Sequence, residues 1–207
     1  NRISILRAGG LEDMAKPKGE AEDDGEAAKR DATDIGPNDC VICLAASGNT
    51  VYPVTIMNIA KAHGATTVGI SNNKDTLLIT GSDIPIFLPT PPEVIAGSTR
   101  LGAGTAQKIA LNMMSSLMGV RLGHVMDGLM VNVIANNAKL FERAENIVME
   151  IAGCDRDTAT KNLKAANGGV KQAILIASGA KDLNDASKYL DMADQNLRSA
   201  IANITTG

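Results

Sequence analysis

The stretch from Cys40 to Thr50 carries residues suited to binding an anion. Its first half is a short, wholly apolar run typical of a strand buried on both faces, and residues 47–50 read Ser-Gly-Asn-Thr. A helical pattern begins at Val51, so the strand would turn at once into a helix and direct backbone N–H groups and hydroxyls at one spot. We interpret the stretch as a cradle for a phosphate or a sugar phosphate. The alternative is an ordinary strand-to-helix turn with a Ser/Thr cap.

A second group of reactive side chains is the acidic cluster at residues 20–24, Glu-Ala-Glu-Asp-Asp. A carboxylate held beside a substrate can act as a general acid or base. Charge alone favours a simpler interpretation, a solvated loop whose carboxylates stabilise the N-terminus of a helix over 26–33. Arg100 and Lys108 are long cations on an otherwise apolar helix, and their simplest role is to extend into solvent.

Strands that alternate with helix-length segments must position these groups. Apolar, β-branched runs predict strands at residues 3–6, 40–44, 66–71 and 84–88. Strands with this spacing imply right-handed βαβ units and a parallel sheet, in which ligands bind at the carboxyl ends of the strands. Pro85 places the last of these runs at an edge of the sheet, because proline cannot donate to a neighbouring strand.

The second half of the chain has helical periodicity. A helix over about 98–122 has small and apolar residues around most of its circumference, which predicts that it is buried. A second long helix is predicted over 129–151 and ends at Gly153. The remainder, 155–201, predicts three short helices that form an appendage.

The bulk composition excludes several classes of function. The 207 residues carry a net charge of −3 without a basic block, which argues against a nucleic-acid partner. No apolar run is long enough to span a bilayer and no signal-peptide pattern opens the chain, so we expect a cytoplasmic protein. Three cysteines make no disulfide framework, and Cys40 and Cys43 would point to opposite faces of a strand, which argues against metal or redox use.

Six segments together resemble a known family. They are Ile-Leu-Arg-Ala-Gly-Gly (5–10), Glu-Ala-Glu-Asp-Asp (20–24), Ala-Ala-Ser-Gly-Asn-Thr (45–50), Val-Gly-Ile-Ser-Asn-Asn (68–73), Glu-Val-Ile-Ala-Gly-Ser-Thr-Arg-Leu-Gly-Ala-Gly-Thr-Ala-Gln-Lys (93–108) and Leu-Met-Val-Asn-Val-Ile-Ala-Asn-Asn-Ala-Lys-Leu (129–140). In this order and spacing, the chain resembles the N-acetylmuramic acid 6-phosphate etherases of the sugar isomerase (SIS) domain superfamily. The resemblance implies an α/β, flavodoxin-like SIS fold with a parallel sheet between helices. We expect residues 1–152 to form the SIS domain, without its first strand and loop, and 153–207 a small helical subdomain.

The resemblance also implies a carbon–oxygen lyase of amino-sugar recycling. Such an enzyme cleaves the D-lactyl ether of N-acetylmuramic acid 6-phosphate, yielding N-acetylglucosamine 6-phosphate and D-lactate. A base removes the proton at sugar C2, lactate leaves from C3, and water adds to the resulting enal. The implied partners are a phosphorylated amino sugar and a second copy of the chain, in a homodimer with its site near the subunit interface. No metal or organic cofactor, nucleic acid or membrane is implied.

By the same resemblance, Glu22 is a catalytic acid/base. The residues implied to bind the phosphate and sugar are Ser47, Gly48, Asn49, Thr50, Glu93, Ser98, Thr99 and Lys108. Another catalytic glutamate and a further phosphate loop are implied upstream of residue 1. Glu20 and Gly102 stand where the family usually has Gly and Lys, and residue 49 is Asn where the family has Arg. The changes at 49 and 102 remove positive charge near the expected anion.

Two other functions remain open from the sequence. A catalytically silent sugar-phosphate sensor, like the glucokinase regulatory protein, would keep the cradle and lose the carboxylates. A phosphosugar isomerase would also remove the C2 proton but would retain the substituent at C3. Release of D-lactate distinguishes the etherase from both.

Overall fold

The computed structural model describes residues 3–10 and 19–206, which form two compact units. The sheet unit ends at Leu111 and the helical unit begins at Asn112. This division falls earlier in the chain than residue 152, because the helix α6 (Ala138–Ala152) packs on the helices that follow it. The domain boundary expected between residues 152 and 153 stays a prediction.

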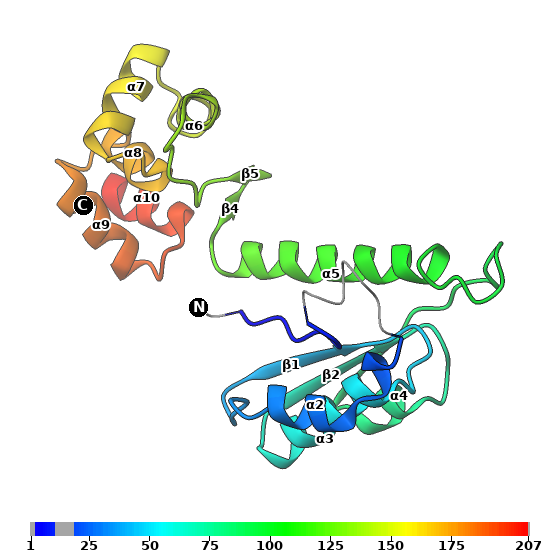
Figure 1. Cartoon of the computed structure of the whole chain (residues 1–207). Helices are drawn as coiled ribbons and strands as arrows, with labels where there is room; N and C mark the ends of the chain where they lie inside the picture. The colour runs from blue at the N-terminus through cyan, green and yellow to red at the C-terminus, as the bar shows by residue number, and fades with distance from the viewer. Residues whose placement is uncertain (1–2, 11–18, 207) are drawn as a thin grey trace. The chain divides into compact units, whose positions relative to one another are not determined.

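A parallel three-stranded sheet forms the centre of the sheet unit (Figure 1), in the order β1–β2–β3. Its strands are β1 (Cys40–Leu44), β2 (Thr66–Ser71) and β3 (Ile84–Phe87). The predicted α/β class is thereby confirmed, and the strand that contains Pro85 lies at an edge. The middle strand, β2, is buried from Thr67 onward, whereas β1 leaves Ile42 43% exposed. The expectation that β1 is buried on both faces is therefore wrong within this single chain.

Helices cover one face of this sheet. After the short turn η1 (Ala21–Asp23), the helices α2 (Gly25–Asp31), α3 (Val51–Ala62) and α4 (Leu77–Gly81) lie on that face (Figure 1). Their core consists mainly of small and aliphatic side chains: Ala28, Ala32, Cys43, Tyr52, Ile56, Met57 and Leu78. Burial raises the pKa of the Cys43 thiol to about 12, so it stays protonated and serves as a small apolar side chain. The segment 3–6, predicted as a strand, has no strand partner among the described residues, and Ile5 is 89% exposed.

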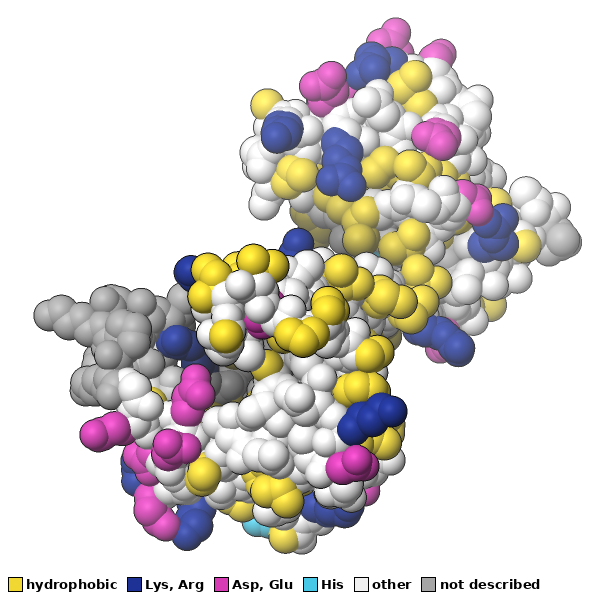
Figure 2. Space-filling view, turned by 90° about the vertical axis from the view of Figure 1, so that its right-hand side faces the viewer, with side chains coloured by type: hydrophobic (Ala, Val, Ile, Leu, Met, Phe, Trp, Pro, Cys, Tyr) yellow, Lys and Arg dark blue, Asp and Glu magenta, His cyan; other side chains and the backbone are white. Residues whose placement is uncertain are grey.

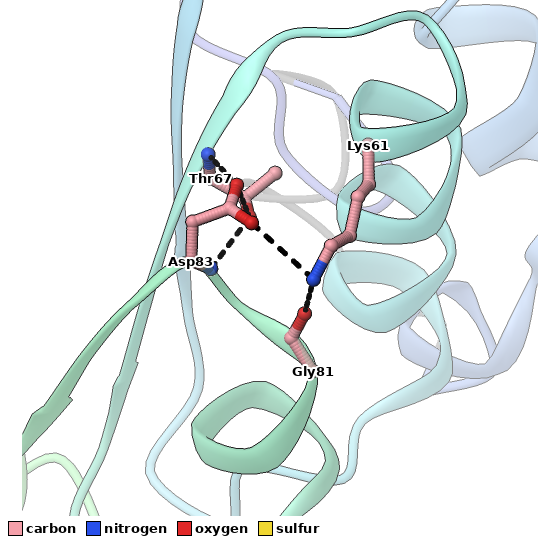
Figure 3. Close-up of polar contacts among 4 residues, drawn as sticks. All are labelled: Lys61, Thr67, Gly81 and Asp83. Atoms are coloured by element: carbon pink, nitrogen blue, oxygen red, sulfur yellow. Dashed lines mark hydrogen bonds and ion pairs between the residues drawn. The ribbon is translucent and has the colours of Figure 1, made fainter.

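A cluster of polar contacts ties the amino ends of β2 and β3 together (Figure 3). Thr67 is fully buried, and both its N–H and its hydroxyl donate to Asp83 Oδ2, at 2.9 and 2.7 Å. Lys61 Nζ lies 3.3 Å from Asp83 Oδ1 and donates to the Gly81 carbonyl at 2.6 Å. These contacts, first the Thr67 hydroxyl, lower the pKa of Asp83 below its ordinary value of 3.8.

Replacing Asp83 by Asn should make stability less dependent on pH. A carboxylate whose pKa is lowered in the folded state contributes stability above its unfolded pKa and loses it as the pH falls through the folded pKa. The free energy of unfolding of the wild type should therefore exceed that of Asp83→Asn at about pH 6, and the gap should shrink towards about pH 3. Urea unfolding at both pH values measures it. A gap that is equal at both would contradict the role of the ionised carboxylate.

The helical unit is built on a different core. The short strands β4 (Val125–Met126) and β5 (Leu129–Met130) form an antiparallel hairpin, and α6 follows. The helices α7 (Arg156–Ala165), α8 (Val170–Ala177), α9 (Leu183–Met192) and α10 (Leu197–Thr206) complete the unit. In the described part of the chain, four helices follow residue 155, whereas the sequence predicted three. The additional break arises because Asp194 and Gln195 adopt left-handed backbone conformations that separate α9 from α10. None of the helices in the described residues has both the length and the apolar character to span a bilayer.

The predicted helix over 129–151 is also wrong in its first half. Residues 129–137 are not helical, and α6 begins only after Asn137, whose side chain accepts a hydrogen bond from the Leu140 N–H at 2.9 Å. The helix ends at Gly153, as predicted, in a left-handed conformation.

The helix α5 (Gly102–Arg121) is the predicted long helix, but it is not buried. Only Ala103 is buried, although most of the helix surface is apolar. Figure 2 shows hydrophobic side chains at the molecular surface, and the exposed large ones on α5 are Ile109, Leu111, Met113, Leu117, Met118 and Val120. The sequence was correct about the apolar character of α5, but the described residues of one chain do not cover it.

Candidate functional site

The Ser-Gly-Asn-Thr loop connects β1 to the first turn of α3. Ser47 Oγ and Thr50 Oγ1 lie 3.1 Å apart, and Ser47 Oγ accepts from the Asn49 N–H at 3.2 Å. Thr50 occupies the N-cap position of α3, but its hydroxyl makes no capping bond to the helix backbone. Two hydroxyls therefore meet at the positive end of a twelve-residue helix, where an anion is favoured.

Gly48 fits where no other residue would. Its φ is +72°, and a Cβ there would lie 2.3 Å from Thr76 Oγ1 and 2.4 Å from Ser71 Oγ. Positive φ and the lack of space both require glycine. The loop is thus packed directly against the end of β2 and the start of α4.

Asn49 holds this loop to α4. Its Oδ1 accepts from the Leu77 N–H at 2.9 Å, and the Gly48 carbonyl accepts from the Leu78 N–H at 3.0 Å. These bonds satisfy two N–H groups at the start of α4. The Asn49 side chain thus has a structural partner within the chain, and its predicted contact with the substrate stays a prediction.

Glu93 binds the N-terminus of α5 with both carboxylate oxygens. The Gly102 N–H donates to Oε2 at 2.8 Å, and the Ala103 N–H donates to Oε1 at 2.9 Å. These two bonds, first that from Ala103, lower the pKa of Glu93. A Cβ at residue 102 would lie 3.2 Å from Glu93 Oε2, so Gly102 leaves room for this contact.

A hollow of about 250 Å³ lies next to the loop, in the sheet unit. Its lining residues are Ala46, Asn72, Asn73, Thr90, Pro91, Pro92, Glu93, Thr99 and Ala103. Of the predicted binding residues, Glu93 and Thr99 line it, and Ser47 directly follows its lining residue Ala46. Ser98 and Lys108 do not line it; Lys108 is exposed on α5. The lining combines amide, hydroxyl and carboxylate groups, which are suited to the hydroxyls of a sugar.

Glu22 lies on the turn η1, which contacts α3. The nearby Gly25 approaches the start of α3, since a Cβ on it would lie 3.5 Å from Val51 Cγ1 and 3.6 Å from Thr55 Oγ1. The fold therefore brings the acidic cluster close to the N-terminal half of α3, which directly follows the Ser47–Thr50 loop. Glu22 is exposed and forms no hydrogen bond or ion pair with the described residues. Its carboxylate is therefore accessible to a substrate.

Sequence reasoning did not select two residues that shape the hollow. Asn72 is 8% exposed and bonds to Gln107 on α5, and Asn73 Nδ2 donates to the Ala46 carbonyl at 2.9 Å. Their position directly after β2 was a usable signal, because polar residues at the carboxyl end of a parallel strand face the ligand site. In the described residues, no group of three His, Cys, Asp or Glu side chains is arranged to hold a metal ion.

Comparison with known proteins adds a family to this geometry. The SIS domain family matches residues 10–117. N-acetylmuramic acid 6-phosphate etherase of Deinococcus radiodurans is 43% identical over 202 residues, which cover 97% of this chain and 66% of the relative. The proteins of the same name from Pseudothermotoga lettingae and Geobacillus thermodenitrificans are 44% and 41% identical, over 94% and 96% of this chain and 65% and 68% of theirs. The chain thus spans about two thirds of the length of these curated relatives.

Proposed function

Because the chain belongs to the SIS-domain family of N-acetylmuramic acid 6-phosphate etherases, we propose that the complete protein cleaves the D-lactyl ether of N-acetylmuramic acid 6-phosphate. The products would be N-acetylglucosamine 6-phosphate and D-lactate. The observation that carries the proposal is the Ser47–Thr50 loop, where two hydroxyls 3.1 Å apart meet at the N-terminus of α3. This is an environment for a phosphate group, because backbone N–H groups and the helix dipole favour negative charge.

The roles of the residues follow from their places around the loop. Ser47, Gly48 and Thr50 would bind the phosphate, and Asn49 would contribute its backbone while its side chain holds α4. Thr99 and Glu93 would line the sugar. Ser98 directly precedes Thr99 and would lie beside the sugar, and Lys108 would approach it from α5. Glu93 is engaged by two N–H groups, so it would reach the sugar only with its remaining lone pairs.

Glu22 would transfer protons. The C2 proton of the sugar is acidic only beside the open-chain aldehyde, so a carboxylate must be held next to C2 in that form. A second acid must protonate the departing lactate oxygen and then deprotonate the water that adds. We assign one of these two roles to Glu22, whose turn lies against α3 and whose carboxylate is unengaged by the described residues. No step of this elimination and hydration requires a redox cofactor.

We also propose that two copies of the chain associate through α5. Its exposed apolar side chains would otherwise remain in contact with water, and covering them is favourable by about 25 cal/mol per Å². A homodimer would place part of the site near the subunit boundary, because α5 also carries Lys108. We expect the protein to act in the cytoplasm, where phosphorylated amino sugars are held by their charge.

The test is release of D-lactate from N-acetylmuramic acid 6-phosphate by the complete protein, coupled to D-lactate dehydrogenase. N-acetylmuramic acid without its phosphate is the matched control, and we expect it to be cleaved much more slowly. Binding of the phosphorylated substrate without lactate release would instead indicate a sugar-phosphate sensor. The proposal would be overturned if the complete protein neither bound the phosphorylated substrate nor released D-lactate from it.

A further inference from the structure

Asn72 joins all three strand ends of the sheet to α5. Its backbone N–H donates to the carbonyl of Ala46, just after β1, at 3.1 Å. Its side-chain Nδ2 donates to the carbonyl of Leu88, just after β3, at 3.1 Å. Its Oδ1 accepts from Gln107 Nε2 of α5 at 2.8 Å. Asn72 itself directly follows β2, so one residue links four elements at the edge where the ligand site lies.

The direction of each bond is fixed by its partners. The Leu88 carbonyl is only an acceptor, so the nitrogen of the Asn72 amide must face it. The oxygen of that amide then faces α5, and Gln107 must present its nitrogen. Asn72 is 8% exposed, so a change that removes the Gln107 donor leaves an acceptor with little access to water.

The first turns of α5 carry part of the proposed sugar-phosphate site. The Thr99 carbonyl accepts from the Gly104 N–H at 2.8 Å, which joins Thr99 to the helix, and Lys108 follows Gln107 directly. The Glu93 carboxylate holds the very start of α5 by accepting hydrogen bonds from two backbone N–H groups of the helix. The bond from Gln107 to Asn72 is a second attachment, about one turn further along, and it is made to the sheet itself.

We propose that Asn72 and Gln107 are positioning residues, whose hydrogen bond sets the distance between the Ser47–Thr50 loop and the Thr99 and Lys108 side of the site. The inference rests on the proposed function, since it concerns how the same site holds a sugar phosphate. Neither residue takes part in the chemistry; together they fix where α5 lies on the sheet.

Gln107→Met tests this in the complete protein, because Met has a similar length but cannot donate. We expect KM for N-acetylmuramic acid 6-phosphate to rise about tenfold, with a much smaller change in kcat. A loss of folded protein would instead lower kcat and leave KM unchanged. Asn72→Ala also removes the bond to the Leu88 carbonyl, so its effect should be at least as large. The double variant should be little worse than Asn72→Ala alone, because that change already removes the bond that Gln107→Met breaks.

The control is Gln195→Met in the helical unit, where the side chain of an exposed glutamine donates to Asp191 on the same stretch of chain. We expect its KM to equal that of the wild type. An unchanged KM in Gln107→Met, or effects of Asn72→Ala and Gln107→Met that simply add, would overturn the positioning role while leaving the proposed function intact. If the wild type releases no lactate, the proposed etherase activity is wrong. The dissociation constant for the same sugar phosphate, measured by calorimetry, then replaces KM in the comparison, and a wild type that does not bind it overturns both proposals.

Discussion

Replacing Glu22 by Gln should reduce D-lactate release by the complete protein at least about a hundredfold. Gln keeps the size and polarity of the side chain but cannot carry a proton between the substrate and water. Because Glu22 is exposed and makes no bond to the described residues, the change should leave the fold undisturbed. The loss should therefore appear in kcat, with KM nearly unchanged. Coupled measurement of D-lactate at several substrate concentrations separates the two.

A matched control for this change is available four residues later. Glu26 is also exposed, lies at the start of α2, and pairs with Lys29 at 2.6 Å on the protein surface. A surface pair of this kind contributes little to stability, so Glu26→Gln should leave both kcat and KM near their wild-type values. Full activity in Glu22→Gln would remove Glu22 from the mechanism, and equal losses in both variants would indicate a general effect of charge.

The second large effect is expected from Gly48→Ala, which should destabilise the protein by roughly 3 kcal/mol and abolish sugar-phosphate binding. The new Cβ would meet Thr76 Oγ1 at 2.3 Å and Ser71 Oγ at 2.4 Å, and the backbone has φ +72°. Thr76 lies at the start of α4 and Ser71 at the end of β2, and both hydroxyls are buried against the loop, so relief of the clash must move the loop. Urea unfolding measures the stability, and calorimetry with the sugar phosphate measures the binding.

Gly97→Ala separates the two causes. Gly97 has a similar φ of +78°, but a Cβ there would have no atom within 4 Å. In this variant the free energy of unfolding should therefore fall only by the strain of placing a Cβ on a left-handed backbone, roughly 1 kcal/mol. The difference between the two variants reports the steric clash at Gly48. Equal losses would contradict the tight packing of the loop against Ser71 and Thr76.

Local patterns were sufficient for the first part of the site. The apolar run at 40–44, the Ser-Gly-Asn-Thr loop and the helix at 51–62 are each specified by a few neighbouring residues, and the structure has them at the predicted positions. The spacing of strands and helices was enough to predict a parallel sheet, because a helix between two strands carries the chain back to the end of the sheet where the first strand began.

The segment 129–137 shows where periodicity fails. Its apolar residues match a helix, but its backbone bonds to distant parts of the chain: the Ala135 N–H donates to the Gly168 carbonyl, and the Val170 N–H donates to the Val133 carbonyl. These long-range bonds replace those of a helix. One local signal was available, since Asp127-Gly128, both at positive φ, is a typical two-residue hairpin turn.

By itself, the sequence determined the class of fold, the loop at the carboxyl end of β1 and the family, because these depend on residue types and short spacings. Only the tertiary structure decided how the parts of the site are held. Asn49 caps α4, Glu93 binds the start of α5, and Asn72 connects Gln107 to the strand ends. Each of these contacts joins residues 9 to 35 positions apart, and a hydrogen bond of that kind exists only once the sheet has set the distances between its partners.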